Sequence, residues 1–267
     1  MRRGLLPVLL LAIALADLVF LALPTLVVLV ASFTPGNIVA FPPEGFSLRW
    51  YAHLAAKPDF LAALWRSLQV GLVCTLLAIP AGTLAALALA RFRIRHAVPL
   101  QLYLLLPFTV PLVVSGVGLM LVFGPLGWLG RVWPVGVACC VINLPFMIWA
   151  VAAAANHLDP DLELAAQNCG APPTHAFFTV TLPALMPGIV TGALVMFILA
   201  VNEFLVSLML VDARTVTLPV LVYNAIRSTI TPDLAAVSVV YVALAGAVIW
   251  LLDRRVGLDL FLKSKQG

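Results

Sequence analysis

Long apolar stretches separated by short polar segments make up most of this chain. A helix needs about 20 consecutive, mainly apolar residues to cross a bilayer. Stretches of that kind cover six parts of the sequence, residues 5–31, 66–90, 98–123, 133–155, 183–210 and 234–252. The pattern therefore predicts an all-α membrane protein with six transmembrane helices in a lipid bilayer.

The first stretch follows Met1-Arg2-Arg3, which resembles the charged start of a signal peptide. The apolar core of a signal peptide has about 7 to 15 residues and leads to a cleavage site of small residues. Residues 5–31 are longer than that and lead to Pro35-Gly36. We therefore expect an uncleaved N-terminal transmembrane helix over 1–33.

The segment that follows, 34–64, mixes turn-forming residues, charges and aromatics such as Trp50 and Tyr51. Trp and Tyr are enriched where a membrane meets water. This predicts an extramembrane segment between the first two spans.

Prolines occur inside the predicted spans, where they would break a helix in water. In a membrane bundle, neighbouring helices and waters can satisfy the carbonyl groups that proline leaves free. We therefore keep the six spans continuous across Pro24, Pro80, Pro107, Pro111, Pro145 and Pro187.

Composition agrees with a membrane protein, since 63% of the residues are hydrophobic, 10% are charged and the mean hydropathy is +1.13. Soluble domains carry about 25% charged residues because their surfaces meet water. Six spans use up this length and leave no room for a nucleotide-binding domain. The net charge of +4 does not indicate nucleic-acid binding, because the basic residues form short clusters between apolar stretches.

Lys and Arg are distributed unevenly between the two sides of the membrane. Cytoplasmic loops carry an excess of these residues near the ends of spans. Six of the 15 lie on one side, and nine lie on the side of the termini: Arg2, Arg3, Arg91, Arg93, Arg95, Arg254, Arg255, Lys263 and Lys265. This predicts that both termini, the tail 254–267 and the loop 156–182 are cytoplasmic.

The loop 156–182 has the boundary signals of a short helix. Asp159 can cap the N-terminus, Pro160 suits the first helical position, and Glu163 is an acid in the first turn. Gly170 can end the helix in a left-handed conformation. A second helical turn can begin at Pro172-Pro173, which predicts a helix-turn-helix ahead of the fifth span.

This loop resembles the cytoplasmic motif of the permease subunits of type I ABC importers. The matching residues are Glu163-Leu164-Ala165-Ala166, Gly170 and Leu182-Pro183. The resemblance implies a type-1 transmembrane core over 65–253 and a coupling helix that docks on a separate ATPase. Leu164 stands where the family usually has Glu, Pro172 replaces a Ser, and Phe177 and Phe178 replace basic residues.

Similarity to the spermidine/putrescine-type branch extends to residues 41–51 and to Thr217-Leu218-Pro219. It implies a subunit of the bacterial inner membrane that moves a polyamine or related small cation and needs no cofactor. It also implies that residues 34–64 lie in the periplasm. The implied partners are an ABC ATPase dimer, a second permease of a different chain and a periplasmic solute-binding protein. Relatives with the same pattern carry ferric ion or phosphonates, so those solutes are the alternatives.

Asn202 and Glu203 interrupt the fifth apolar stretch. An acid near the centre of a membrane helix costs about 2.5 to 3.5 kcal/mol on insertion scales, which makes it a candidate for a functional site. One interpretation places both residues on the translocation path. The other is a structural hydrogen bond to a neighbouring helix.

Other function classes have little support in the sequence. It contains no phosphate-binding GxxxxGK[ST], no HExxH and no GxSxG, and its cysteines and histidines have no metal-ligand spacing. We therefore expect a transport subunit that is not an enzyme and holds no metal. A stand-alone secondary carrier or channel would often show an internal repeat, which the six unequal stretches do not show. An intramembrane enzyme would need paired catalytic groups within the spans, and the sequence has no such pair there.

Overall fold

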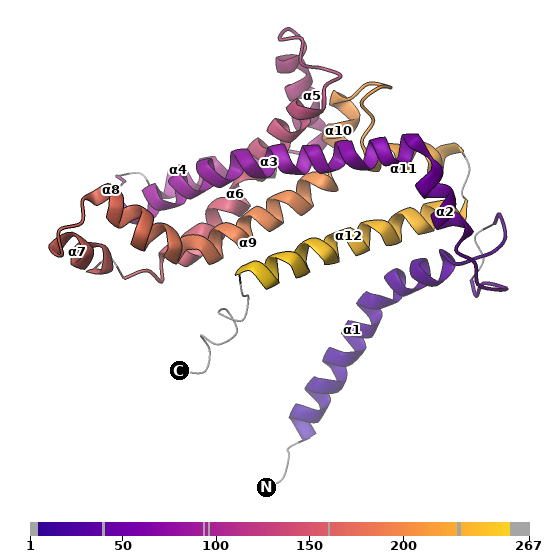
Figure 1. Ribbon diagram of the computed structural model, residues 1–267, viewed down its shortest axis with the longest axis horizontal. Coiled ribbons are helices and arrows are strands. Elements are labelled where there is room, and N and C mark those ends of the chain that lie inside the picture. Colours follow the sequence, from indigo (N-terminus) through magenta and orange to yellow (C-terminus); the bar gives the residue numbers. More distant parts are fainter. Residues whose placement is uncertain are drawn as a thin grey trace. The chain divides into compact units, whose positions relative to one another are not determined.

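The computed structural model describes residues 5–38, 41–92, 94–95, 97–159, 161–228 and 231–256, and all regular structure in these ranges is helical (Figure 1). Arg2, Arg3, Arg93, Pro160, Lys263 and Lys265 lie outside the described residues. The elements are α1 (Leu5–Ala31), α2 (Arg49–Ala56), α3 (Pro58–Arg91), α4 (Ala97–Thr109), α5 (Leu112–Phe123), α6 (Val132–Ala155), α7 (Asp161–Asn168), α8 (Pro173–Ala176), the π-helix η1 (Phe177–Thr181), α9 (Leu182–Val201), α10 (Leu205–Leu210), α11 (Leu218–Ser228) and α12 (Pro232–Val256).

The predicted all-α membrane fold is confirmed, but the count of six spans is not. Within the described residues, four helical segments are long and apolar enough to cross a membrane: Leu9–Ala31, Pro58–Arg91, Val132–Ala155 and Pro173–Val201. Residues Leu102–Thr109 and Leu112–Phe123 make a fifth span if the bent pair counts as one. Pro232–Ala247, in the last predicted span, falls among the shorter apolar helices.

Two predicted spans are broken rather than continuous. The stretch 98–123 bends by 97° between α4 and α5, where Pro111 has an extended backbone. Proline has no N–H to donate and its ring clashes with the preceding turn. The stretch 183–210 ends its first helix at Val201, and Asn202 to Phe204 separate α9 from α10.

Helix α3 starts earlier than the sequence predicts, at Pro58 instead of about residue 66. Pro58 opens the helix and Asp59 lies in its first turn. Proline is well tolerated at a first helical position, and the helix dipole favours an acid there. α3 therefore includes the end of the segment that the sequence predicts to be extramembrane.

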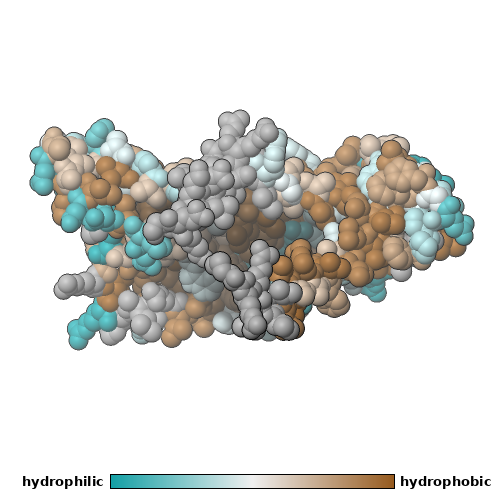
Figure 2. All heavy atoms as spheres, turned by 90° about the horizontal axis from the view of Figure 1, so that it is seen from below, coloured by the Kyte–Doolittle hydropathy of each residue, from teal (hydrophilic) through white to brown (hydrophobic). Residues whose placement is uncertain are grey.

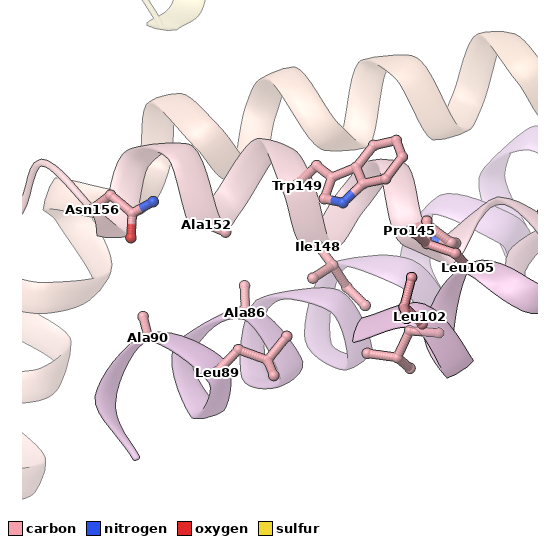
Figure 3. A pocket seen from close by; sticks show the side chains of 11 residues that line it. Ala86, Leu89, Ala90, Leu102, Leu105, Pro145, Ile148, Trp149, Ala152 and Asn156 are labelled. Carbon is pink, nitrogen blue, oxygen red and sulfur yellow. The ribbon is translucent and has the colours of Figure 1, made fainter. Parts of the chain in front are cut away.

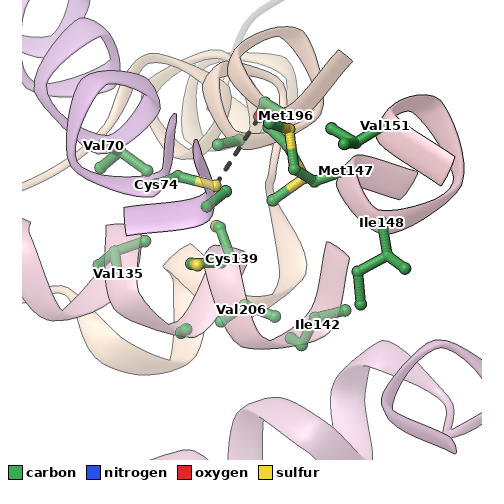
Figure 4. Close-up of a cluster of buried hydrophobic side chains, with 14 of the residues drawn as sticks. Val70, Cys74, Val135, Cys139, Ile142, Met147, Ile148, Val151, Met196 and Val206 are labelled. Atoms are coloured by element: carbon green, nitrogen blue, oxygen red, sulfur yellow. Dashed lines mark hydrogen bonds between the residues drawn. The ribbon is translucent and has the colours of Figure 1, made fainter. Parts of the chain in front are cut away.

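The chain forms two compact units, residues 62–221 with 246–267 and residues 1–61 with 222–245. In the larger unit α6 packs along α9 and α5 packs against α10 (Figure 1). Figure 4 shows its core, where Cys74 of α3 and Cys139 of α6 are buried beside Met147 and Met196. The Cys74 thiol donates to the carbonyl oxygen of Met196 at 3.8 Å. Because the side chain is fully buried among apolar neighbours, Cys74 acts as a small core residue.

Close helix approach in this unit depends on glycine. A Cβ on Gly188 would lie 2.6 Å from the carbonyl oxygen of Ala150, and one on Gly82 would lie 2.4 Å from Cγ of Met147. Gly188 and Gly192 form the spacing that lets membrane helices pack at short distance. α9 and α3 therefore approach α6 more closely than larger residues would allow.

The smaller unit ties the segment after α1 to the start of α12. The Trp50 indole N–H donates to the carbonyl of Thr34 at 2.9 Å, and Lys57 pairs with Asp233 at 3.1 Å. Outward-facing apolar residues are common over the chain, and Figure 2 shows hydrophobic residues across much of its coloured surface. Such a surface is suited to lipid rather than to water.

Candidate coupling loop and translocation site

The loop 156–182 contains the helix that the sequence predicts, α7. The backbone N–H of Asp161 donates to the Asp159 carboxylate at 2.9 Å, as a capping side chain should. At the other end Gly170 has φ +94°, and the N–H groups of Gly170 and Ala171 donate to the carbonyls of Gln167 and Ala166. This pair of bonds is the Schellman arrangement, which ends a helix at a left-handed residue.

Helix α7 presents two different faces. Glu163, Ala166 and Gln167 are partly buried against the chain, whereas Leu162 and Leu164 are 52% and 54% exposed. No residue of α7 is fully buried. Leu164, which stands where the family usually has an acid, is therefore an apolar side chain that is more than half exposed, next to the exposed Ala165.

The Glu163 carboxylate is engaged inside the chain. The Thr181 hydroxyl donates to its Oε2 at 2.6 Å, and Arg91 donates to the same oxygen and, at 3.0 Å, to the Thr181 hydroxyl. The bond from Thr181 and the charge and hydrogen bond of Arg91 lower the pKa of Glu163 below its ordinary value. Sequence reasoning had assigned Arg91 to topology alone and did not identify Thr181 as a partner.

A hollow of about 560 Å³ adjoins this contact. It lies between the end of α3, the end of α6 and α7, and its lining includes Arg91, Asn156, Glu163 and Leu164.

The second half of the loop runs into the fifth span without a break. α8, η1 and α9 form one helical run from Pro173 to Val201, so Leu182 and Pro183 lie in the first turn of α9. In η1 the N–H of Leu182 donates to the carbonyl of Phe177, five residues earlier. π-helices are rare, occur mostly as single turns inside α-helices, and are frequent at functional sites.

A second candidate site lies where the two broken spans meet. A pocket of about 450 Å³ is lined by residues 108–112 at the break between α4 and α5, by Asn143 and Phe146 of α6, and by Leu199 and Glu203. Asn143 is only 8% exposed, and sequence reasoning missed it. A lone polar residue in the apolar stretch 133–155 was the only signal that could have identified it.

Glu203 has a structural contact as well. Its Oε1 accepts a hydrogen bond from the backbone N–H of Val206 at 3.0 Å, which caps the first turn of α10. Asn202, by contrast, is exposed, donates to the carbonyl of Ile198 and is not among the residues that line the pocket. The structure therefore brings only one of the two predicted path residues to the pocket.

A different pocket, of about 330 Å³, lies between α3, α4 and α6 (Figure 3). Its lining is apolar apart from Asn156, and Ile148 of α6 extends toward the side of α3 that carries Ala86. It contains no charged side chain, so it offers less to a charged solute than the pocket at Glu203. Among the described residues, no group of three or more His, Cys, Asp or Glu side chains could hold a metal ion.

Comparison with known proteins gives the family. Residues 78–257 match the model of the binding-protein-dependent transport system inner membrane component. The chain belongs to this permease family. The match spans more than half of the chain and includes the loop 156–182, so the type I ABC importer resemblance is confirmed.

Curated relatives of the permease carry different solutes. It is 29% identical to the putrescine transport system permease protein PotI of Escherichia coli strain K12, over 91% of this chain and 90% of that protein. It is 31% identical to the molybdenum transport system permease protein ModB of Mycobacterium tuberculosis, over 88% and 89%. It is 30% identical to the putative 2-aminoethylphosphonate permease PhnV of Salmonella typhimurium, over 89% of both.

Solved structures show the same fold. The permease aligns with a chain of a bacterial ABC transporter that imports the acidic polysaccharide alginate, with a TM-score of 0.72, 18% identity and 94% of each chain covered. It also aligns, with a TM-score of 0.70, 19% identity and coverage of 94% and 93%, with that transporter in complex with its alginate pentasaccharide-bound periplasmic protein.

Proposed function

We propose that this permease carries a small organic cation, such as putrescine or spermidine, as a transmembrane subunit of an ATP-driven importer. A periplasmic binding protein delivers the solute, and a second, different permease chain completes the path. A cytoplasmic dimer of ABC ATPases supplies the energy. Because the relatives include permeases for molybdenum and 2-aminoethylphosphonate as well as putrescine, the choice of a cation rests on the charge of the pocket.

The observation that carries this proposal is Glu203 in the pocket between the broken spans. Its carboxylate is the one charged group among the residues that line the pocket, which otherwise contribute apolar, aromatic, amide and hydroxyl side chains. A lone carboxylate in a low-dielectric site attracts a cation and repels an anion such as molybdate.

The helix ends at the two breaks also favour a positively charged solute. α4 ends at Thr109 and α9 ends at Val201, and residues from the last turn of each helix line the pocket. The C-terminal end of a helix carries a partial negative charge, and unwound ends of this kind coordinate cations in transporters. Leu112, the first residue of α5, brings one N-terminal end of opposite charge to the pocket, so two C-terminal ends and Glu203 outweigh it and favour an ammonium group.

Replacing Glu203 with Gln tests the proposal sharply. Gln keeps an oxygen that can accept the Val206 N–H and cap α10, but it removes the negative charge. We expect uptake of labelled putrescine to fall at least about tenfold, which is the effect of losing one charge-assisted contact. Glu44→Gln, a change of the same kind at an exposed position in the segment 34–64, should leave uptake unchanged.

Competition with spermidine, ferric ion, molybdate and 2-aminoethylphosphonate identifies the solute class in the same cells. If the Gln variant takes up putrescine as fast as the original chain from pH 6 to 8, Glu203 only caps α10 and the cation proposal is wrong. Competition by molybdate or the phosphonate, without competition by polyamines, would assign an anion instead.

The coupling loop and the topology complete the proposal. The exposed side chains of α7, Leu162, Leu164 and Ala165, dock on the ATPase, while Leu182 and Pro183 begin the span that moves with it. Both termini lie in the cytoplasm, with 34–64 in the periplasm and 65–253 as the transport core. Impermeant labelling of cysteines placed at each terminus and at Glu44 checks this topology, because only the periplasmic site should react in intact cells.

A further inference from the structure

We infer that Arg91, Glu163 and Thr181 form a clamp that fixes α7 to the end of α3 and to the start of α9, and that Glu163 positions the coupling helix instead of contacting the ATPase. The three residues come from three separate helical elements, and all three donor–acceptor contacts between them are present. The inference rests on the proposed function only in taking α7 as the docking element.

Helix α7 has little else to hold it in place. It contains eight residues, a length at which an isolated helix is marginal, and none of them is fully buried. Its other contacts are with α8 and η1 and through the partly buried Ala166 and Gln167. Among the described residues, the clamp supplies the side-chain hydrogen bonds that join α7 to other helices.

The burial of the three side chains agrees with an internal role. The Glu163 side chain is 18% exposed, the Arg91 side chain is 38% exposed, and Thr181 is buried. A carboxylate that accepts two donors from its own chain has little surface left for a partner. Its neighbours Leu162 and Leu164 are more than half exposed, so their side chains are available to meet the ATPase.

The position of Thr181 gives the clamp a mechanical consequence. Thr181 is the last residue of the π-helix, immediately before α9, and Arg91 is the last residue of α3. A displacement of α7 is therefore transmitted to two spans at one point, through hydrogen bonds of the stronger, charge-assisted kind.

Hydrogen exchange of the α7 amides in the full-length permease, held in lipid nanodiscs, tests the clamp directly. Thr181→Val keeps the shape of the side chain and removes the hydroxyl, whereas Thr181→Ser keeps the hydroxyl. We expect Thr181→Val and Glu163→Gln each to speed exchange at least about tenfold. Thr181→Ser should stay within about twofold of the original chain, as should Asp161→Asn, an exposed acid in the same turn. Equal exchange in all variants would overturn the inference.

The assembled transporter separates positioning from docking. Arg91→Met, Glu163→Gln and Thr181→Val should all retain the co-purifying ATPase but lower solute-stimulated ATP hydrolysis. The double variant Arg91→Met/Glu163→Gln should lower solute-stimulated ATP hydrolysis no further than either single variant does, because both substitutions remove the same contact. Loss of the ATPase from the Glu163 variant alone, or fully additive effects, would make Glu163 a docking residue and overturn the inference. Failure to take up any polyamine would refute the proposed solute but leave the exchange result decisive for the clamp.

Discussion

Replacing Gly170 with Val should uncouple transport while leaving membrane insertion intact. Gly170 has φ +94°, a conformation that residues with a side chain rarely adopt, and it closes the Schellman end of α7. A Cβ at this position would meet nothing within 4 Å. The substitution therefore acts through backbone strain and not through a clash.

The size of the effect follows from that strain. A residue held in a sparsely populated backbone region costs about 1 to 3 kcal/mol. A free energy of that size changes a two-state equilibrium about 5- to 150-fold. Because α7 buries no residue fully, it has little packing energy to offset the cost, and the end of the helix should open.

Uptake of labelled putrescine, in cells lacking the native copy, measures the consequence. We expect Gly170→Val to lower uptake at least about fivefold at unchanged membrane abundance. Gly127→Val is the matched control, because Gly127 also has a positive φ and open space but lies between α5 and α6. Normal uptake by the Gly170 variant would refute the coupling role of this turn.

Three further outcomes are expected. The purified permease alone should hydrolyse no ATP, since its sequence lacks a phosphate-binding loop; steady turnover by a contaminant-free sample would contradict this. Gly188→Ala should destabilise the packing of α6 and α9 by about 1 to 3 kcal/mol and lower the Tm in detergent, whereas Gly118→Ala, with open space, should not. The clamp should hold above the ordinary pKa of Glu163, about 4.3, and be lost as pH falls through its lowered pKa. A fluorophore on Cys169, the one exposed cysteine of the four, should report constant α7 mobility from pH 8 to 5 and an increase only below about pH 4; an increase already at pH 6 would contradict the lowered pKa.

Local signals in the sequence were sufficient for much of this protein. The apolar stretches indicated the membrane helices but not their number, and Asp159 and Gly170 marked both ends of α7. These features depend on a residue and its near neighbours, because hydropathy, capping and left-handed backbone act over a few positions. The motif built on them was enough to indicate the permease family.

The effect of each proline depended on its surroundings. Pro80, Pro145 and Pro187 lie inside continuous helices, whereas the chain bends by 97° at Pro111. Whether the carbonyls freed by a proline find other partners is decided by the helices packed around it. The sequence could therefore place the prolines but could not identify the one that breaks a span.

By itself, then, the sequence determined the membrane class, the capped helix α7 and the presence of an acid in the fifth apolar stretch. The tertiary structure decided which residues that acid meets and what holds α7. Glu163 lies 72 positions from Arg91 and 18 from Thr181, and Glu203 reaches the pocket beside Asn143 only because α6 packs along α9. Contacts between distant segments depend on how whole helices pack, and no local pattern in the chain encodes that packing.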